Sequence, residues 1–331
     1  MAKRKKKGSK IKKLIITLLV LIVIFIVLCF ITPSSESNGL SADGSISGLE
    51  LPAPIEGEEI IKHTGYTLSY NEEYEVPSYV AYELTKDEIL GGEERNDSFR
   101  EDPAVRTGSA TLDDYRGSGY DRGHMAPAAD FKWSEAAMKD TFYLSNMCPQ
   151  DPSFNRGIWA DLEAVVRTMA YDNESIYVVT GPVLTDGPYE RIGESRVAVP
   201  KQFYKVVLDY TDPDIKAIGF ILPNENSDKS LQSFAVTVDE VERVTGIDFY
   251  PALPDEAEEI IESEMRTSDW NFTQFIPTGE EPDPSQLEYV SPASSLPERV
   301  LNAAIDVFVE LKGEIFKSLG IENIASALGL L

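Results

Sequence analysis

Apolar and polar residues follow two different periods along the middle of the chain. The segment 60–71 alternates and is rich in Tyr and Thr, which is typical of a β-strand. In 158–169 the apolar residues recur every three or four positions, which predicts an amphipathic helix. Further strand-like segments are 76–84, 175–184, 202–210 and 215–223.

Two more helices are expected between and after these strands. Ser134 is a candidate N-cap for a packed helix over 134–147. The segment 234–246 ends in a helix closed by Gly246. Because strands and helices do not alternate regularly, the pattern favours an α+β fold over a doubly wound parallel sheet.

The beginning of the chain has the pattern of a membrane anchor. Residues 1–13 carry eight Lys or Arg and no acid, and the 19 residues of 14–32 carry no charge. This length suits a helix across a ~30 Å hydrocarbon core, and the basic tail is expected to stay cytoplasmic. We therefore expect a single-pass cell-membrane protein whose remainder is extracellular. A cleaved signal peptide is the alternative, in which case the protein is secreted.

Composition divides the rest of the chain. Residues 33–58 are rich in Ser, Gly, Pro and Glu and are expected to form a flexible linker before a domain at 59–275. A second linker is expected at 276–294. The segment 295–331 has an amphipathic helical pattern, which suits docking on the domain, a membrane surface or a partner.

The residues 114–130 form the stretch with the clearest chemistry, D-Y-R-G-S-G-Y-D-R-G-H-M-A-P-A-A-D. A neutral imidazole at His124 can take a proton from water, and Arg122 can pair with phosphate oxygens. Gly123 allows a close approach of the backbone to a ligand. This combination indicates attack on a phosphodiester. The chain's other histidine, His63, is expected to be a polar strand residue.

Two polar residues accompany the helix predicted at 158–169. Asn155 lies at or just before its start, where an asparagine by itself is more often a helix cap. Glu163 follows eight residues later, about 12 Å along a helix axis. Side chains lean toward the helix start, so Glu163 is expected to point back toward Asn155.

Three motifs in order resemble those of the DNA/RNA non-specific endonucleases, which are ββα-metal nucleases of the His-Me finger type. They are D-R-G-H with A-P-A-A, then F-Y-L-S-N-M-C-P-Q, then N-R-G-I-W-A-D-L-E. The likeness covers roughly 60–255. It implies an α+β fold with a central mixed or antiparallel sheet flanked by helices.

The resemblance also implies roles around a metal ion. His124 falls on the general base that activates water, and Asn155 on the one direct protein ligand of Mg²⁺, for which Mn²⁺ can substitute. Glu163 falls on a residue that helps to hold the water shell of the metal, and Asp121 is expected to support that shell.

Further positions correspond to residues that contact or position the substrate. Arg122 falls on a phosphate-contacting arginine, and Asn146 on an active-site asparagine that positions the motif or the substrate. The family uses one more arginine upstream. Arg95 and Arg100 both remain candidates for it, with Arg95 preferred.

Charge weighs against broad contact with nucleic acid. The net charge is −26, and beyond residue 13 the chain has 22 basic against 56 acidic residues, a balance of −34. Phosphate binding usually rests on Lys and Arg, so binding outside the site is expected to be weak and salt-sensitive.

The expected function is that of a Mg²⁺-dependent, sequence-non-specific endonuclease acting on DNA and RNA outside the membrane. The alternative is a membrane-tethered nucleic-acid-binding or DNA-uptake component with little catalysis. A third interpretation is hydrolysis of small phosphodiesters, which share the reaction but need no long groove.

Overall fold

A large antiparallel sheet forms the centre of the protein. The structure, a computed structural model, describes residues 46–95, 97–211 and 215–275. All neighbouring strands of the sheet are antiparallel, in the order β1-β2-β3-β6-β9-β10-β11. The strands are β1 Glu59–Lys62, β2 Thr67–Asn71, β3 Val76–Thr85, β6 Ser175–Pro182, β9 Gln202–Asp209, β10 Lys216–Pro223 and β11 Ala235–Val236.

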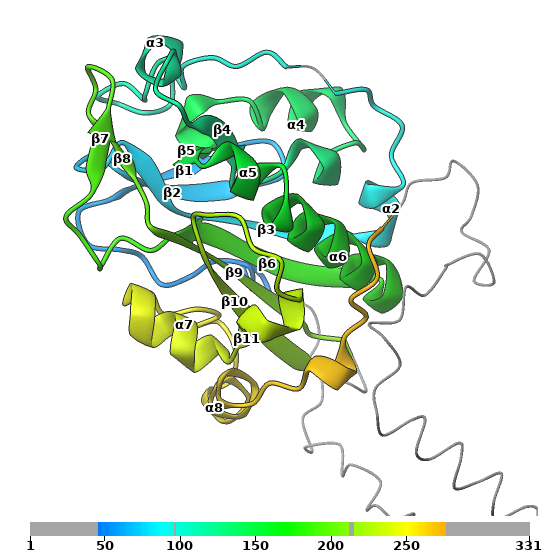
Figure 1. The fold of residues 1–331 in the computed structure, drawn as a ribbon. Helices are drawn as coiled ribbons and strands as arrows, with labels where there is room; N and C mark the ends of the chain where they lie inside the picture. The colour runs from blue at the N-terminus through cyan, green and yellow to red at the C-terminus, as the bar shows by residue number, and fades with distance from the viewer. Residues whose placement is uncertain (1–45, 96, 212–214, 276–331) are drawn as a thin grey trace, which may run out of the picture. The chain divides into compact units, whose positions relative to one another are not determined.

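Helices cover both faces of this sheet (Figure 1). The helix α6 lies on one face, and α7 and α8 lie on the other. The helices are α2 Lys86–Ile89, α3 Leu112–Tyr115, α4 Glu135–Asp140, α5 Pro152–Asn155, α6 Ile158–Asn173, α7 Val238–Thr245 and α8 Asp255–Ser263. The described part of the chain is therefore α+β with a predominantly antiparallel sheet, as predicted.

The central strands β6 and β9 are mostly apolar on both faces, because helices cover both sides of the sheet. Successive residues of a strand point to opposite faces. In β6, Val178 belongs to the apolar cluster that includes Leu162 of α6, whereas Val179 belongs to the cluster that includes Val241 of α7. The sheet thus separates two cores.

A second, small sheet carries the D-R-G-H motif. Its strands β4 (Asp121–His124) and β5 (Met147–Gln150) are antiparallel, with Gly123 opposite Cys148. A side chain at Gly123 would lie 2.0 Å from Oε1 of Gln150, so only glycine fits. The helices α5 and α6 follow β5 directly, which gives the succession strand, strand, helix. The strands β7 (Glu190–Ile192) and β8 (Val197–Val199) form another two-stranded sheet.

Two predicted elements differ in detail. The single strand expected at 60–71 is a hairpin of β1 and β2, because Gly65 in the intervening turn has φ +90°, a conformation that suits glycine. The helix expected at 134–147 ends at Asp140, and a 3₁₀ turn, Leu144–Asn146, leads into β5. Ser134 caps α4 as expected, because its side chain accepts from the N–H of Ala137.

The folded part also begins earlier than the expected boundary at residue 59. Leu49, in the segment expected to be a linker, is fully buried. The carboxylate of Glu58 accepts hydrogen bonds from Ser69, Asn71 and Ser78. The expected second linker and C-terminal helical segment lie outside the described residues.

The expected transmembrane anchor, 14–32, also lies outside the described residues. Within residues 46–95, 97–211 and 215–275, no helix is long and apolar enough to cross a membrane. The helix α6 has 16 residues and includes Asp161 and Glu163, whereas a spanning helix needs about 20 mostly apolar residues. The predicted single-pass membrane location with an extracellular domain is therefore corrected, because the described helices give it no support.

Candidate active site

His124 ends β4 in an aromatic environment. The residue is only 8 % exposed, and its ring centroid lies 5.6 Å from that of Phe99 and 5.1 Å from that of Phe142. Its buried Nε2 has no hydrogen-bond partner among the residues that the structure describes. Because Nε2 is shielded from solvent, water can approach only the small part of the residue that stays exposed.

The electrostatic surroundings keep His124 neutral. Burial lowers its pKa from 6.5 to about 3, and the positive charges of Arg95 and Arg122 act in the same direction. The carboxylate of Asp97 opposes them. At neutral pH the ring is therefore uncharged and can accept a proton.

The chain after His124 is held by Asn146, which is fully buried. Its Nδ2 donates to the carbonyls of Ala126 and Thr141 at 3.0 and 2.8 Å, and its Oδ1 accepts from the N–H of Ala126 at 2.9 Å. The amide is thus occupied by backbone groups. Of the two roles that the sequence left open, this geometry suits positioning of the motif, not contact with substrate.

Two arginines lie close to the rings that enclose His124. The guanidinium of Arg122 is exposed and lies 4.1 Å from the ring centroid of Phe99. That of Arg95 lies 5.3 Å from the ring centroid of Phe142, and its Nε donates to Asp97 at 2.7 Å. Cation–π contacts of this kind hold a guanidinium in place and leave donors for an anion.

Arg100, the other upstream candidate, is occupied elsewhere. It stacks on Tyr143 at 3.8 Å and donates to the carbonyl of Lys139 and to Asp140. Of the two arginines, Arg95 is therefore the one beside His124. An open hollow of about 560 Å³ adjoins it, lined by Gly92, Glu93, Glu94, Arg95, Asp97, Glu135, Met138 and Lys139.

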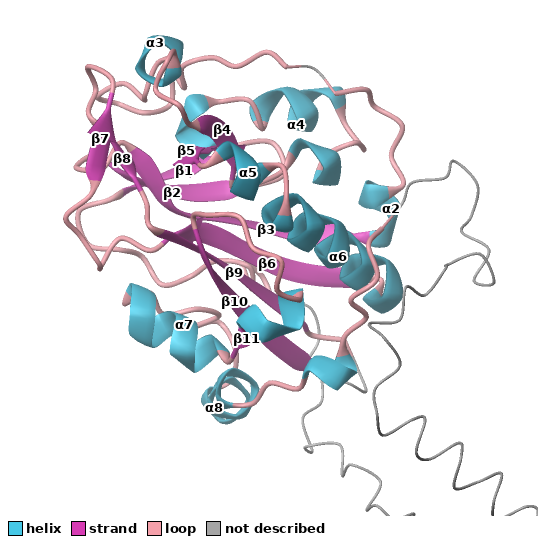
Figure 2. Ribbon diagram, in the orientation of Figure 1, coloured by secondary structure: helices cyan, strands magenta, loops and turns pink. Residues whose placement is uncertain are grey.

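Asn155 is the last residue of α5, a helix that lies beside β4 (Figure 2). Its Nδ2 donates to Asp121 at 3.0 Å, and Arg156 donates twice to the same carboxylate, at 2.7 and 2.6 Å. Burial raises the pKa of Asp121, but the hydrogen bonds from Arg156 and Asn155 outweigh this effect and lower it. No hydrogen bond to Oδ1 of Asn155 occurs among the described residues, so that oxygen can act as a ligand.

The structure excludes a helix-capping role for Asn155 at α6. The cap of that helix is Gly157, and a Cβ at this position would lie 2.4 Å from the carbonyl oxygen of Ser153. Asn155 ends α5, whereas Glu163 lies on α6, which begins at Ile158. The two residues are therefore not on one continuous helix, and the expected separation of about 12 Å along a helix axis does not apply to them.

Glu163 belongs to a buried group of charges on α6 and the sheet. Burial raises its pKa to about 7, with the charges of Lys205 and Arg167 lowering it and Asp130 raising it. Arg167 donates to Asp130 at 3.0 Å, and Tyr82 donates to the same carboxylate at 2.7 Å. A carboxyl group in this setting is poised between its charged and neutral forms near pH 7.

Sequence reasoning missed four charged residues in these two groups, Asp130, Arg156, Arg167 and Lys205. Lys205 is 1 % exposed, and its Nζ donates to Thr180. The sequence contained a signal for Lys205, because it lies within the mostly apolar strand 202–210. A lysine buried in such a strand needs a charged or polar partner, which points to a group of charges. For Arg156 the signal was its position directly after Asn155.

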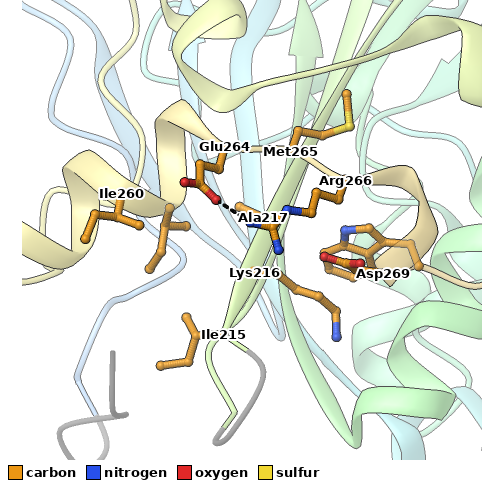
Figure 3. Close-up of a pocket in the computed structure, with 10 residues that line it drawn as sticks. Ile215, Lys216, Ala217, Ile260, Glu264, Met265, Arg266 and Asp269 are labelled. Carbon is orange, nitrogen blue, oxygen red and sulfur yellow. Dashed lines mark hydrogen bonds and ion pairs between the residues drawn. The ribbon is translucent and has the colours of Figure 1, made fainter. Parts of the chain in front are cut away.

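Two other sites lie apart from the D-R-G-H strand. Ligating oxygens of Asp239, Glu242 and Glu262, on α7 and α8, lie within 4.8 Å of one another. A cavity of about 50 Å³ lies beside β10 and α8, and Figure 3 shows the residues that line it. It is lined by Ile215, Lys216, Ala217, Ile260, Ile261, Glu264, Met265, Arg266, Asp269 and Trp270, none of which was predicted to be functional.

Comparison with known proteins supports the resemblance seen in the motifs. Residues 49–256 match the family model described as "DNA/RNA non-specific endonuclease". The chain is 38 % identical over 217 residues to the mitochondrial nuclease EXOG of Mus musculus, covering 60 % of this chain and 59 % of that protein. It is 40 % identical over 225 residues to Nuclease C1 of Cunninghamella echinulata var. echinulata, covering 63 % of this chain and 89 % of the relative.

A solved structure agrees in fold. It is described as "Crystal structure of the EndoG/EndoGI complex: Mechanism of EndoG inhibition", and it matches with a TM-score of 0.58 and 33 % identity, covering 66 % of this chain and 95 % of that one. The chain spans 59 % of the mouse relative and 63 % of a nuclease EXOG from Danio rerio, less than two thirds of either. Both relatives are named mitochondrial, which also gives no support to the predicted extracellular location.

Proposed function

This chain belongs to the DNA/RNA non-specific endonuclease family, and from that premise we propose that it is a Mg²⁺-dependent endonuclease that hydrolyses phosphodiester bonds of DNA and RNA without sequence preference. The observation that carries the proposal is the neutral His124, adjoined by Arg95 and Arg122. These are a proton acceptor and two phosphate-binding cations in one place.

The donor set around Asn155 fits a magnesium ion. Asp121 holds the amide nitrogen of Asn155, which leaves Oδ1 without a hydrogen bond among the described residues. Magnesium uses few protein oxygens and keeps several waters, so one amide oxygen with nearby carboxylates suits it. Asn155 would be the direct ligand, while Glu163 and Asp121 would hold coordinated water. When bound, the ion would neutralise charge on the phosphate and stabilise the leaving oxygen.

His124 acts as the general base. Its neutral imidazole accepts a proton from the attacking water as the new P–O bond forms and the bond to the leaving oxygen breaks. The aromatic rings of Phe99 and Phe142 exclude bulk water from the imidazole and fix its orientation. Asn146 positions the base by holding the backbone of Ala126.

Arg122 and Arg95 bind the phosphate and stabilise the charge that develops on it. Contacts to phosphate oxygens carry no information about the bases. Cleavage is therefore expected to depend little on sequence and to extend to RNA as well as DNA.

The test uses the full-length chain with supercoiled plasmid, with Mg²⁺ or with excess chelator. We expect nicking and linearisation only with Mg²⁺. Replacing the base, His124→Ala, is expected to lower kcat by about 10²–10⁴ while the circular dichroism spectrum is retained.

The matched control changes the other histidine. His63 pairs with the buried Asp102 at 2.8 Å and stacks on Tyr143 at a centroid distance of 4.7 Å. His63→Gln is expected to lower Tm, because it removes the buried contact with Asp102. It is expected to leave kcat within about threefold, because His63 is not part of the proposed site. Full activity in His124→Ala would overturn the mechanism. A metal-independent gel shift without cutting would favour nucleic-acid binding without catalysis.

A further inference from the structure

Helices α7 and α8 bring together three carboxylates that the proposed reaction does not use. Asp239 and Glu242 lie three residues apart on α7, a spacing that puts both on one side of the helix. Glu262 lies near the end of α8, which packs beside α7 (Figure 1). One ligating oxygen from each lies within 4.8 Å of the other two.

Glu262 has the least ordinary environment of the three. The residue is only 6 % exposed, and its buried Oε1 has no hydrogen-bond partner among the described residues. A buried carboxylate oxygen without a donor is expensive, so something absent from the protein chain is expected to satisfy it.

Basic side chains do not balance these acids. Among the described ion pairs none includes Asp239, Glu242 or Glu262, and the nearby Arg243 pairs with Glu240 instead. Burial raises the pKa of Glu262 to about 9, and Glu242 is the largest of the neighbouring charges that add to it. The crowding of like charges is the condition that a bound cation relieves.

The cavity beside the same helix offers a contrast. Arg266 there pairs with Glu264 (Figure 3). Lys216 pairs with Asp209. Its charged groups are therefore satisfied within the chain, and a volume of about 50 Å³ leaves room for little beyond water.

We propose that Asp239, Glu242 and Glu262 bind one divalent cation of the Ca²⁺ type, which fastens α7 to α8. The donors are all oxygens, which suits a hard cation better than zinc, whose protein sites are built mainly from Cys and His. Oxygens that share one Ca²⁺ at 2.3–2.6 Å lie at most about 5 Å apart, which matches the spacing of the three ligands.

Two features favour Ca²⁺ over Mg²⁺. Three carboxylates exceed the one or two that Mg²⁺ usually takes from a protein. One oxygen of Glu242, Oε1, already accepts the N–H of Phe249 at 2.7 Å, so the set is irregular, which Ca²⁺ tolerates better than Mg²⁺. Asp239 is exposed, so water completes the coordination on that side.

The cation is expected to affect stability and not chemistry. The helices α7 and α8 pack in the core on one face of the sheet, whereas α6, with Glu163, packs in the core on the other. The inference therefore stands independently of the proposed nuclease activity.

The test measures Ca²⁺ binding to the chelator-treated full-length chain by calorimetric titration and by Tm. At a Ca²⁺ concentration about 100 times Kd, Tm of the unaltered protein is expected to rise by roughly 5 °C or more. Glu262→Gln is expected to weaken binding at least tenfold and so to remove about half of that rise or more. Asp239→Asn, at an exposed position, is expected to weaken binding without a folding defect.

Two controls isolate the site. Glu258→Gln removes the same charge from the same helix outside the three ligands and is expected to keep the Ca²⁺-dependent rise in Tm. Asn155→Ala removes the proposed magnesium ligand and is expected to keep it too. The proposal fails if Glu262→Gln and Asp239→Asn gain as much from Ca²⁺ as the unaltered protein. It also fails if Tm of the unaltered protein changes with pH but not with Ca²⁺, because Glu242 and Glu262 then share a proton.

Discussion

At the scale of single residues, two histidines of the same chemical type differ because of their neighbours. His63 has a carboxylate partner, Asp102, which also accepts from Ser145 at 2.5 Å. His124 has no such partner among the described residues, and the charges of Arg95 and Arg122 disfavour its protonation. The first residue is therefore suited to holding the fold and the second to accepting a proton.

The pH dependence of the reaction follows from this environment. A general base works in its deprotonated form, so the rate falls as the pH drops through its pKa. Because burial lowers the pKa of His124 to about 3, its neutral form persists far below the usual value of 6.5. We therefore expect that, at saturating Mg²⁺, protonation of His124 causes no fall in kcat/KM between about pH 8 and pH 5.

Glu163 is a second group that can titrate in this range, because burial raises its pKa to about 7. The Glu163→Gln variant therefore separates its contribution to the pH profile from that of His124. A limb in this range that disappears in Glu163→Gln belongs to Glu163. A limb near pH ~6.5 that persists in Glu163→Gln would contradict the environment assigned to His124.

At the scale of elements, the strands β4 and β5 are aligned by one buried amide. Asn146, at the entry to β5, binds the backbone of Ala126, two residues beyond the end of β4. Gly123 within β4 permits the close packing of Gln150 from the paired strand. The position of His124 thus depends on residues that do not touch the substrate.

Asn146→Ala tests this alignment. The variant leaves buried backbone groups of Ala126 and Thr141 without partners, which is expected to cost about 2–4 kcal/mol of stability. We also expect kcat to fall more than KM changes, because the base moves while Arg95 and Arg122 still bind phosphate. Steady-state kinetics and thermal unfolding measure the two effects.

Asn71→Ala is the matched control. Asn71 also binds a backbone N–H, that of Tyr74, and donates to Glu58, but it lies on β2 in the large sheet. A comparable loss of Tm with kcat unchanged is expected. If Asn146→Ala loses stability and no activity, Asn146 does not position the base.

At the scale of the whole molecule, the net charge is strongly negative, whereas a broad nucleic-acid-binding surface is positive. The net charge of −26 repels a polyanion, so productive binding depends on few cations close to the scissile phosphate. The proposed phosphate contacts are those of Arg95 and Arg122.

The salt dependence of KM measures this. Two phosphate contacts predict a slope of log(1/KM) against log[salt] of roughly −2 on duplex DNA, at constant free Mg²⁺. Arg122→Gln is expected to reduce the slope by about 1 and to weaken binding similarly for all sequences. A slope several units steeper would mean that an extended basic surface takes part, contrary to the charge of the chain.

The sequence by itself determined the family, the α+β class and most of the elements. Period and composition predicted β3, β9 and α6 because each buries a regular apolar pattern. The three ordered motifs identified the family, which the match over residues 49–256 confirms. The roles of the motif residues remain predictions that the experiments above test.

Tertiary structure alone decided which charges meet. The contact of Asn155 with Asp121 spans 34 residues, and Lys205 comes to lie near Glu163 from a distant strand. The pairing of α7 with α8, which brings Glu262 to Asp239, likewise has no local signal. The physical reason is that periodicity reports which face of an element is buried, whereas charge partners depend on how separate elements pack.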